Sequence, residues 1–475
     1  MLPKLPNNAT LKKGIETKTV CASLDFVKAR RVALARFRTL EDLFVDPPDP
    51  LPKDLEGMEN HLEVVCGKFR RTLYSYSVFI GGSVLDQIIY EKLRDASVTD
   101  PIGDALSLIR AVGIHKPGLV LYPLHSFGLL SVGLFEKLTP HRYELFVDPG
   151  EICVRGQTNS LKETIRFIER ASVSMGINRT VPVDSVEHYS RSRPTKWLTK
   201  NPLLVLKARS FSGNYYENQR FLMLHLERAC SLLFMLASLQ HGFPVKKEEH
   251  FFSTGAINDW GTQDIFHFIL FEPEAKSRNR FDGVCVPMNY DSVELAELSN
   301  VNVDINLRNW AYRTPVVKKI CDALAVVESG YLRSNILSDG GSVRGRVYRK
   351  IMQSLRYFRR SFRPSSGDDD IVMLTIALEV LLTDSYAPQT GERLGERSEA
   401  LLKGYPRKKE CLEKIERIYD ARNQVVHTGH QTTEVDLPTV QEAYTICILA
   451  LIERIPGLPQ KSADPMARLI LGARL

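Results

Sequence analysis

The chain has 475 residues, of which 44% are hydrophobic and 25% charged, and its formal net charge is +7. This composition is typical of a soluble globular protein and excludes disordered and membrane-spanning chains. The length indicates roughly two to four domains. The modest positive charge suits an anionic partner but does not require one.

The cysteines and the start of the chain indicate a cytoplasmic protein. Eight cysteines stand singly, without a CxxC pair or zinc-finger spacing, which is typical of reduced thiols. The opening MLPKLPNNATLKK lacks the apolar core of a signal peptide, and no run of about eighteen apolar residues occurs. Phosphate-binding loops, dinucleotide fingerprints and zinc-protease motifs are also missing from the sequence. We therefore expect no metal, no cofactor and no membrane partner.

Residues 1–60 are expected to form an N-terminal helix followed by a connector. The segment FVKARRVALARF, residues 26–37, is a basic helix candidate. The proline-rich run PPDPLP, residues 47–52, cannot continue a helix and indicates a linker.

Residues 61–314 are expected to form a mixed α/β domain. Helical periodicity occurs in VLDQIIYEKL and in the long segment ENQRFLMLHLERACSLLFMLASL. The short apolar runs that predict strands are GLVLYPL, YELFVD, PLLVLKA, DIFHFILF and FDGVCVPM. No catalytic motif identifies the role of this region, so a sensor and an enzyme of unrecognised type both stay open.

Residues 315–475 are expected to form an all-helical domain. Strand signals nearly vanish there, and about five or six helical segments follow, separated by breaks that contain glycine or proline. The predicted fold class is therefore α+β, in which a mixed α/β N-terminal region precedes an all-α C-terminal helical bundle.

The segment YDARNQVVHTG places three chemically capable side chains near one helix end. A helix from about residue 407 to 427 is expected, stopped by Gly429 in a left-handed cap. At roughly 100° per residue, Arg422 falls in the middle of the apolar face. A cation in that position needs anionic or hydrogen-bonding partners. The stripe on this face consists of Cys411, Ile415, Tyr419, Arg422 and Val426.

Asn423 and His427 lie four residues apart on one edge of the same face. An imidazole beside a guanidinium suits RNA cleavage, because the imidazole takes the proton of a 2′-hydroxyl and the arginine stabilises charge on the phosphorane. This scheme requires no metal. The alternative is structural, since an arginine and a histidine in a last turn also complement the helix dipole. The same spacing recurs at Arg110/His115 and Arg220/His225.

Context separates the third copy of this spacing from the other two. Its arginine is followed by an asparagine and comes after the pattern LEVLL…ERLGERSEALL…IYDARNQVVH. Roughly residues 343–455 thereby resemble the HEPN domains, specifically their ApeA-like branch, whose hallmark is Arg-x4–6-His with a polar residue after the arginine. The resemblance implies a helical bundle that forms a homodimer, so that two Arg-Asn-His sets meet in one cleft. It also implies a metal-independent endoribonuclease of antiviral or toxin systems, with Arg422 and His427 as the catalytic pair and Asn423 as a positioning residue.

The segment SVRGRVYRKIMQSLRYFRRSFR is predicted to be a basic amphipathic helix. It carries eight basic residues and no acidic one. Its apolar stripe leaves most arginines facing outward, where they suit RNA phosphates, and a merely solvated face is the alternative. The stripe consists of Ile351, Leu355, Phe358 and Phe362, and the predicted RNA-binding residues are Arg356, Arg359, Arg360 and Arg363.

The helix DDDIVMLTIALEVLLTD is apolar nearly all round, with Glu379 as its interior charge. A buried carboxylate needs a cation. Arg393, Arg397 and Arg422 are the candidates, and a structural ion pair between Glu379 and Arg397 is the specific prediction.

The sequence thus predicts a cytoplasmic endoribonuclease whose N-terminal region restrains the C-terminal domain until a trigger ligand or protein arrives. The alternative from another class is a non-catalytic scaffold that binds RNA or protein with the same bundle. The feature that separates the two is whether Arg422 and His427 face solvent in a cleft or are consumed by internal contacts.

Overall fold

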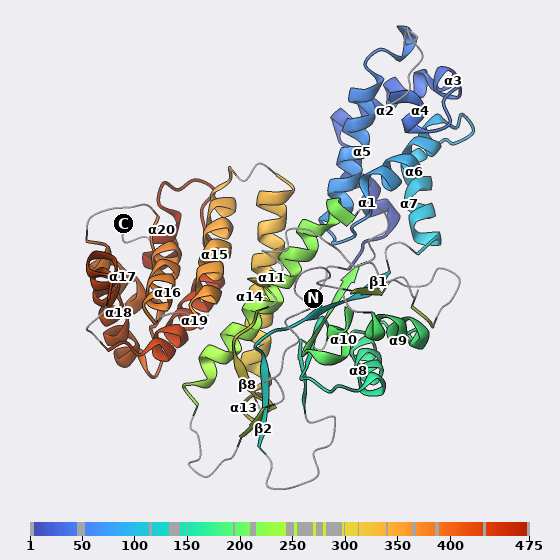
Figure 1. Ribbon diagram of the computed structural model, residues 1–475. Coiled ribbons are helices and arrows are strands. Elements are labelled where there is room, and N and C mark those ends of the chain that lie inside the picture. The colour runs from blue at the N-terminus through green and yellow to red at the C-terminus, as the bar shows by residue number, and fades with distance from the viewer. Residues whose placement is uncertain are drawn as a thin grey trace.

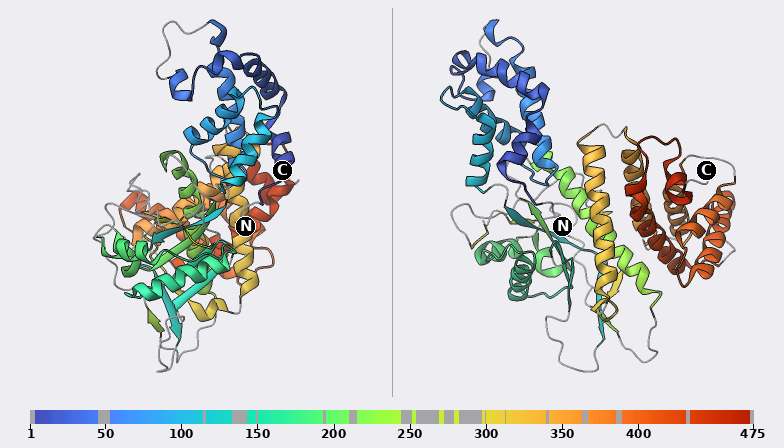
Figure 2. Two further views of the ribbon diagram at one scale, coloured as in Figure 1. Left: turned by 90° about the vertical axis from the view of Figure 1, so that its right-hand side faces the viewer. Right: turned by 180° about the vertical axis from the view of Figure 1, so that it is seen from behind.

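The protein has an α+β fold in which helices at both ends of the chain flank a central sheet region (Figure 1). The computed structural model describes residues 4–44, 53–113, 116–132, 143–148, 150–192, 195–209, 215–243, 251–253, 269–271, 279–281, 297–298, 300–311, 313–338, 341–362, 367–384, 389–430 and 434–472. Figure 2 shows the N-terminal helices projecting from one end of the molecule, away from the C-terminal bundle.

The N-terminal helices form a unit with its own hydrophobic core, which runs from Leu11 to Ile109. The predicted division at residue 60 falls inside α5, and α5 packs against both α1 and α2, so no break in packing occurs there. The expected helix over residues 26–37 is divided at Arg30, between α2 and α3. Residues 47–52 lie outside the described residues. The helices are α1 (Asn8–Ile15), α2 (Lys18–Ala29), α3 (Arg31–Leu34), α4 (Leu40–Phe44), η1 (Lys53–Leu55), α5 (Met58–Tyr74), α6 (Gly82–Arg94) and α7 (Pro101–Ala111).

A five-stranded antiparallel sheet with the order β3-β4-β5-β1-β7 follows. The strands expected over 118–124, 143–148 and 202–208 are confirmed by β1, β3 and β5, and the expected run 264–271 contains β7. The run 281–288 lies almost entirely outside the described residues. The bounds are β1 (Pro117–Pro123), β3 (Glu144–Asp148), β4 (Ile152–Arg155), β5 (Leu203–Arg209) and β7 (Ile269–Phe271). A separate three-stranded sheet contains β2 (Gly128–Val132), β6 (Phe251–Ser253) and β8 (Asp304–Asn306).

Both faces of the five-stranded sheet are covered by helices. Successive strand side chains point to opposite faces, so Leu119 and Leu121 of β1 join the core beneath one set of helices, while Val120 and Tyr122 join the other. The first set is α8 (Leu161–Ser174), α9 (Val183–Arg191) and α10 (Trp197–Lys200). The second face is covered by α11 (Tyr215–Gln240).

Helix α11 is the central element of the molecule, because it contacts β5 on one side and α14, α15 and α19 on the other. Its part Phe221–Gln240 is long and apolar enough to cross a membrane, yet the apolar window within this part is completely buried inside the protein. That is the environment of a core helix rather than of a helix that faces lipid. The segment's continuous apolar character follows from having protein on all sides.

The C-terminal bundle consists of helices, as predicted. Helix α14 of the bundle packs on α11, and one continuous core joins the sheet, α11 and the bundle. The boundary expected at residues 314 and 315 therefore marks the start of a helix but not a gap between packed units. The elements are α13 (Leu307–Ala311), α14 (Thr314–Tyr331), the π-helical turn η5 (Leu332–Ile336), α15 (Val343–Arg360), α16 (Gly367–Leu382), α17 (Thr390–Leu401), α18 (Lys408–Thr428), α19 (Leu437–Arg454), η6 (Ile455–Gly457) and α20 (Pro465–Leu471).

Candidate functional site

The candidate site lies at the C-terminal end of α18. This helix ends as predicted, because Gly429 adopts φ 81° and its N–H donates to the carbonyl of Val425. A left-handed φ favours glycine, which lacks a Cβ. The chain therefore turns away directly after the last helical turn, and that turn carries His427 at the surface.

Arg422 lies at the edge of the buried face of α18, not in its middle. The predicted stripe fails at its end, because Val426 is 53% exposed. The buried residues of α18 follow a different line along the helix, because α18 packs on α16, α17 and α19 together. Arg422 is half-buried as a result. The buried residues of α18 are Cys411, Ile415, Ile418 and Ala421.

The guanidinium of Arg422 is only partly satisfied by the protein. One terminal nitrogen donates to the Asn423 side-chain oxygen at 3.2 Å, so the first two residues of the predicted triad are in contact. The Nε atom of Arg422 is buried and has no hydrogen-bond partner in the described structure. An arginine with an unused, buried donor can bind a water molecule or an anionic ligand.

His427 is exposed, and within the described residues it makes no hydrogen bond or ion pair. It follows Asn423 by one helical turn. The imidazole is thus free to meet a ligand or a second molecule, although it is not among the residues that line the cleft described next. The structure brings Arg422 and Asn423 together and leaves His427 farther along the same helix.

A large open cleft of about 1190 Å³ lies among α16, α17 and α18, and Arg422 and Glu379 line it. Carboxylates outnumber cations in its lining, which makes the cleft acidic. Burial raises the pKa of Glu379 from its ordinary value, although the charge of Arg422 opposes this shift. The acidic lining residues are Glu379, Asp384, Glu392, Glu396, Glu399, Glu416 and Asp420, and the basic ones are Lys350, Arg393 and Arg422.

The structure does not pair Glu379 with Arg397. Arg397 lies 3.9 Å from Asp384 and donates to the carbonyl of Leu382. The Asp384 carboxylate also accepts from the backbone N–H groups of Met466 and Ala467 at the start of α20. Arg397 therefore helps to fix α20, and the cation that acts on Glu379 is Arg422, one of the three arginines that the sequence offered as candidates.

The predicted RNA-binding arginines of α15 do not form a free outward face. The expected apolar stripe is confirmed, but the helix is enclosed on more than one side. Arg359 is 8% exposed and bonds Ser231 and Glu227 of α11, and Arg356 also donates to Glu227, at 2.7 Å. Arg360 forms two hydrogen bonds with Glu297. Arg363 lies outside the described residues.

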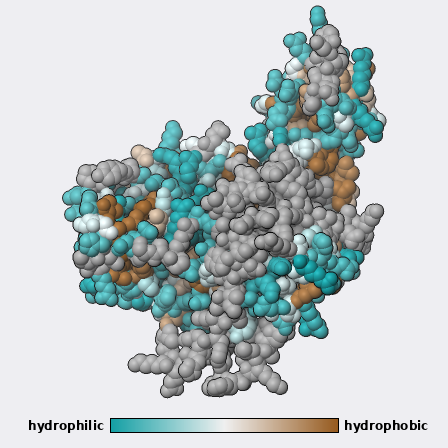
Figure 3. Space-filling view, in the orientation of Figure 1, coloured by the Kyte–Doolittle hydropathy of each residue, from teal (hydrophilic) through white to brown (hydrophobic). Residues whose placement is uncertain are grey.

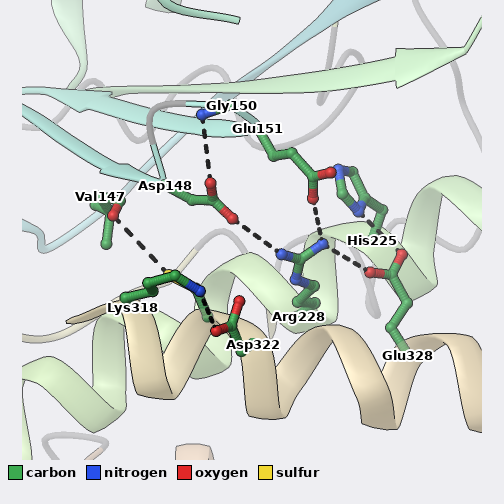
Figure 4. A network of polar contacts seen from close by, with 10 residues as sticks. Val147, Asp148, Gly150, Glu151, His225, Arg228, Lys318, Asp322 and Glu328 are labelled. Carbon is green, nitrogen blue, oxygen red and sulfur yellow. Dashed lines mark hydrogen bonds and ion pairs between the residues drawn. The ribbon is translucent and has the colours of Figure 1, made fainter. Parts of the chain in front are cut away.

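A buried ion network that the sequence did not predict lies between the sheet and the bundle (Figure 4). Arg228 of α11 bonds Glu151 at 2.6 Å, Glu328 at 3.1 Å and Asp148 at 3.2 Å. His225 lies 2.9 Å from the second oxygen of Glu328. The charged turn HLER inside an otherwise apolar helix was the available signal, because charges in a core helix need partners.

The network strongly favours its charged forms. Burial by itself would raise the pKa of Glu328, but His225 and Arg228 outweigh it and lower the pKa to about 2. Burial likewise opposes the charge of Arg228, and the carboxylates around it, Glu328 first, raise its pKa nonetheless. These residues join three elements through charge, which is a structural role.

No group of three or more histidine, cysteine or acidic side chains within the described residues is placed to hold a metal ion. Comparison with protein-family models, with curated proteins and with solved structures found no match to this chain. The case for a function therefore depends on the geometry of the site.

Proposed function

We propose that the C-terminal bundle is a metal-independent HEPN-type endoribonuclease with Arg422 and His427 as catalytic residues and Asn423 as a positioning residue. The observation that supports this proposal most is the unused, buried Nε donor of Arg422 at the wall of an open cleft. His427 is likewise not consumed by internal contacts among the described residues.

The proposed reaction follows from these two side chains. The neutral imidazole of His427 takes the proton of a ribose 2′-hydroxyl, and the 2′-oxygen attacks the adjacent phosphorus. Arg422 donates to the phosphoryl oxygens, where negative charge increases in the transition state. The bond from phosphorus to the 5′-oxygen breaks, and that oxygen takes a proton from a protonated imidazole. The products are a 2′,3′-cyclic phosphate and a 5′-hydroxyl.

A homodimer through the C-terminal domain is part of the proposal, because it would supply a second imidazole as the acid. One side of α16 carries half-buried apolar residues beside the cleft, which suits contact with a second copy. Figure 3 shows apolar side chains among hydrophilic ones on the bundle face at the left of the view. The α16 residues are Val372, Met373, Ile376 and Val380. Light scattering at tens of micromolar protein tests the pairing, and a monomer would count against it.

The deciding experiment is digestion of single-stranded RNA in excess chelator. We expect the full chain to leave 2′,3′-cyclic phosphate ends, and His427→Ala and Arg422→Ala each to lower the rate by about 10²- to 10⁴-fold. His430→Ala is the matched control, because His430 is also exposed and lies just beyond the helix. Cleavage that survives both alanine substitutions would show that the site is wrong. Cleavage that appears only with added metal would show that the mechanism is wrong.

The acidic lining of the cleft favours a second candidate, a non-catalytic scaffold. Seven carboxylates and three cations line it, and a net negative cleft repels RNA phosphates. In that case the bundle would bind a partner protein or bind RNA elsewhere on its surface. RNA binding without cleavage by the full chain would select this candidate.

The proposal further holds that the N-terminal region restrains the nuclease in the cytoplasm until a trigger ligand or protein arrives, as in antiviral or toxin-like systems. The contact that suits this role is Glu227 of α11 with Arg356 and Arg359 of α15. The seven cysteines that the structure describes are free thiols, which suits a reducing compartment. Because α14 packs on α11, the test uses the full chain. Glu227→Gln should raise RNA cleavage, through His427, whereas unchanged or lower activity would argue against restraint at this contact.

A further inference from the structure

The basic helix α15 has two halves whose arginines bond different kinds of acceptor. In the C-terminal half, Arg356, Arg359 and Arg360 bond carboxylates. In the N-terminal half, Arg344 donates to the carbonyl of Pro456 at 3.3 Å, and Arg346 donates to the carbonyl of Ser462 at 2.7 Å. A carbonyl oxygen orients a guanidinium but leaves its full positive charge in place.

The positive charge of the N-terminal half is exposed. Arg344 and Arg346 are both exposed, and they alternate with the buried residues Val343, Gly345 and Val347. Within the described residues, neither arginine forms an ion pair with a carboxylate. Each uses one of its five N–H donors on a carbonyl, and the others remain available to a ligand.

Further positive charge gathers at the same place. Arg333 of η5 is exposed, and η5 packs against α15. Burial raises the pKa of Tyr348, and the nearby charges of Arg344 and Arg333 oppose this rise. Lys461 is exposed next to Ser462, the residue whose carbonyl holds Arg346. The first turn of α15 contains no acidic residue, and its helix dipole is positive at that end.

The exposed arginines of the N-terminal half of α15 lie close to the candidate site. Lys350 follows on the same helix and lines the cleft that Arg422 also lines. Helix α15 lies beside α16, which forms a wall of that cleft, and beside α20 (Figure 1). A chain of phosphates lying along the N-terminal half of α15 would therefore reach the rim of the cleft at Lys350.

We propose that Arg333, Arg344, Arg346 and Lys461 form the surface that binds the phosphate backbone of single-stranded RNA. Arginines held in position by carbonyls lose less side-chain freedom when they bind phosphate, and several neighbouring cations make binding dependent on salt. This inference deepens the proposed function, on which its link to Arg422 rests. The predicted RNA contact thereby changes from the C-terminal half of α15, whose arginines bond carboxylates, to the N-terminal half, whose arginines bond carbonyls.

The test measures binding of a fluorescein-labelled single-stranded RNA by anisotropy, in the full chain with His427→Ala so that the probe stays intact. Salt is varied from about 50 to 200 mM. The combined Arg333→Gln, Arg344→Gln and Arg346→Gln variant should bind about tenfold or more weakly. Its slope of log affinity against log salt should fall by about 2, since each contact with a single strand contributes about 0.7.

Two further variants separate charge from structure. The Arg344→Lys with Arg346→Lys variant keeps the charge and should keep the slope, even where affinity falls. The matched control is Arg356→Gln with Arg360→Gln, which removes two partly exposed charges that already bond carboxylates. It should leave the slope nearly unchanged. A triple variant that binds RNA with the affinity and slope of the parent would overturn the inference.

The outcomes also separate this inference from the ribonuclease proposal. If the chain cleaves RNA and the triple glutamine variant, with His427 intact, cleaves equally well at low RNA concentration, the surface is wrong and the nuclease stands. If the triple variant loses RNA binding while no form of the chain cleaves RNA, the RNA-binding surface is supported and the ribonuclease proposal is wrong. Loss of binding to anionic phospholipid vesicles, with RNA binding unchanged, would identify a membrane partner and overturn the RNA assignment.

Discussion

His225 and His427 both follow an arginine by five residues, in RFLMLH and RNQVVH, and both lie on helices. Their surroundings are opposite. His225 is 6% exposed and bonds Glu328 inside the ion network of α11, whereas His427 is exposed at the last turn of α18. A helix enclosed by a sheet and a bundle must bring charged partners to the charges that it carries. A helix end at the surface has no such requirement, so it can keep groups free for a ligand.

The largest expected effect is on the buried member of this comparison. Arg228→Met should lower the free energy of unfolding by about 3 to 5 kcal/mol, because three carboxylates would lose their shared cation. Urea unfolding measures the change. Arg422→Ala should cost less, about 1 kcal/mol, since it ends one side-chain bond to Asn423 and removes the charge that acts on the half-buried Glu379. Equal losses in the two variants would show that the two arginines are equally important for stability.

Acid should weaken the network at Glu328. The folded-state pKa of this carboxyl is lowered from 4.5 to about 2, so its contribution is complete above about pH 4.5 and is lost as the pH falls through about 2. A shift of this size corresponds to about 3 kcal/mol at most. Unfolding of wild type and Glu328→Gln between neutral pH and pH 3 measures it. The stability difference between them should shrink on acidification, and a constant difference would contradict the assignment.

Removal of His225 and removal of His427 should have very different effects on the free energy of unfolding. His225→Ala deletes a buried partner of Glu328 and should cost about 1 to 3 kcal/mol of unfolding free energy. His427→Ala should change stability by less than about 0.5 kcal/mol, because the side chain is exposed and unpaired within the described residues. Thermal unfolding under one buffer condition compares the two. A loss of stability in the His427→Ala protein would indicate that His427 has a structural role.

The smallest expected effect concerns the acidic cleft beside Arg422. Glu416→Gln with Asp420→Asn removes two exposed negative charges from its lining. RNA affinity should rise by about two- to fivefold at low salt, because repulsion of phosphates near Arg422 weakens. The matched control is Glu59→Gln with Asp104→Asn, which removes the same charge from the exposed surface of the N-terminal helices. A similar rise in the control would show that only net charge matters.

The elements with strong local signals were predictable from the sequence. The strands β1, β3 and β5, the long helix α11 and the glycine stop of α18 follow from period, length and cap residue. The roles of the α15 arginines were not predictable in the same way. One helix period places Arg356, Arg359 and Arg360 on the polar side, but Glu227 and Glu297, which bond them, come from segments more than sixty residues away.

The site shows the same limit. The sequence placed Arg422, Asn423 and His427 on one helix end, because i, i+1 and i+5 positions near a glycine stop are local geometry. It did not determine which of its carboxylates would approach Arg422, or that Arg397 would bond Asp384 instead of Glu379. A buried charge takes its partner from whichever element packs against it, and packing is a property of the whole chain.

The α+β class, the helical C-terminal third and the local arrangement of the α18 end could therefore be predicted from the order of the amino acids alone. Tertiary structure decided which charges are consumed and which remain free. Helix α11 lies between the sheet and the bundle, so the charges of its HLER turn became ion pairs on both sides. The physical reason is that desolvation acts only on groups that distant segments cover, and that cover does not exist until the chain has folded.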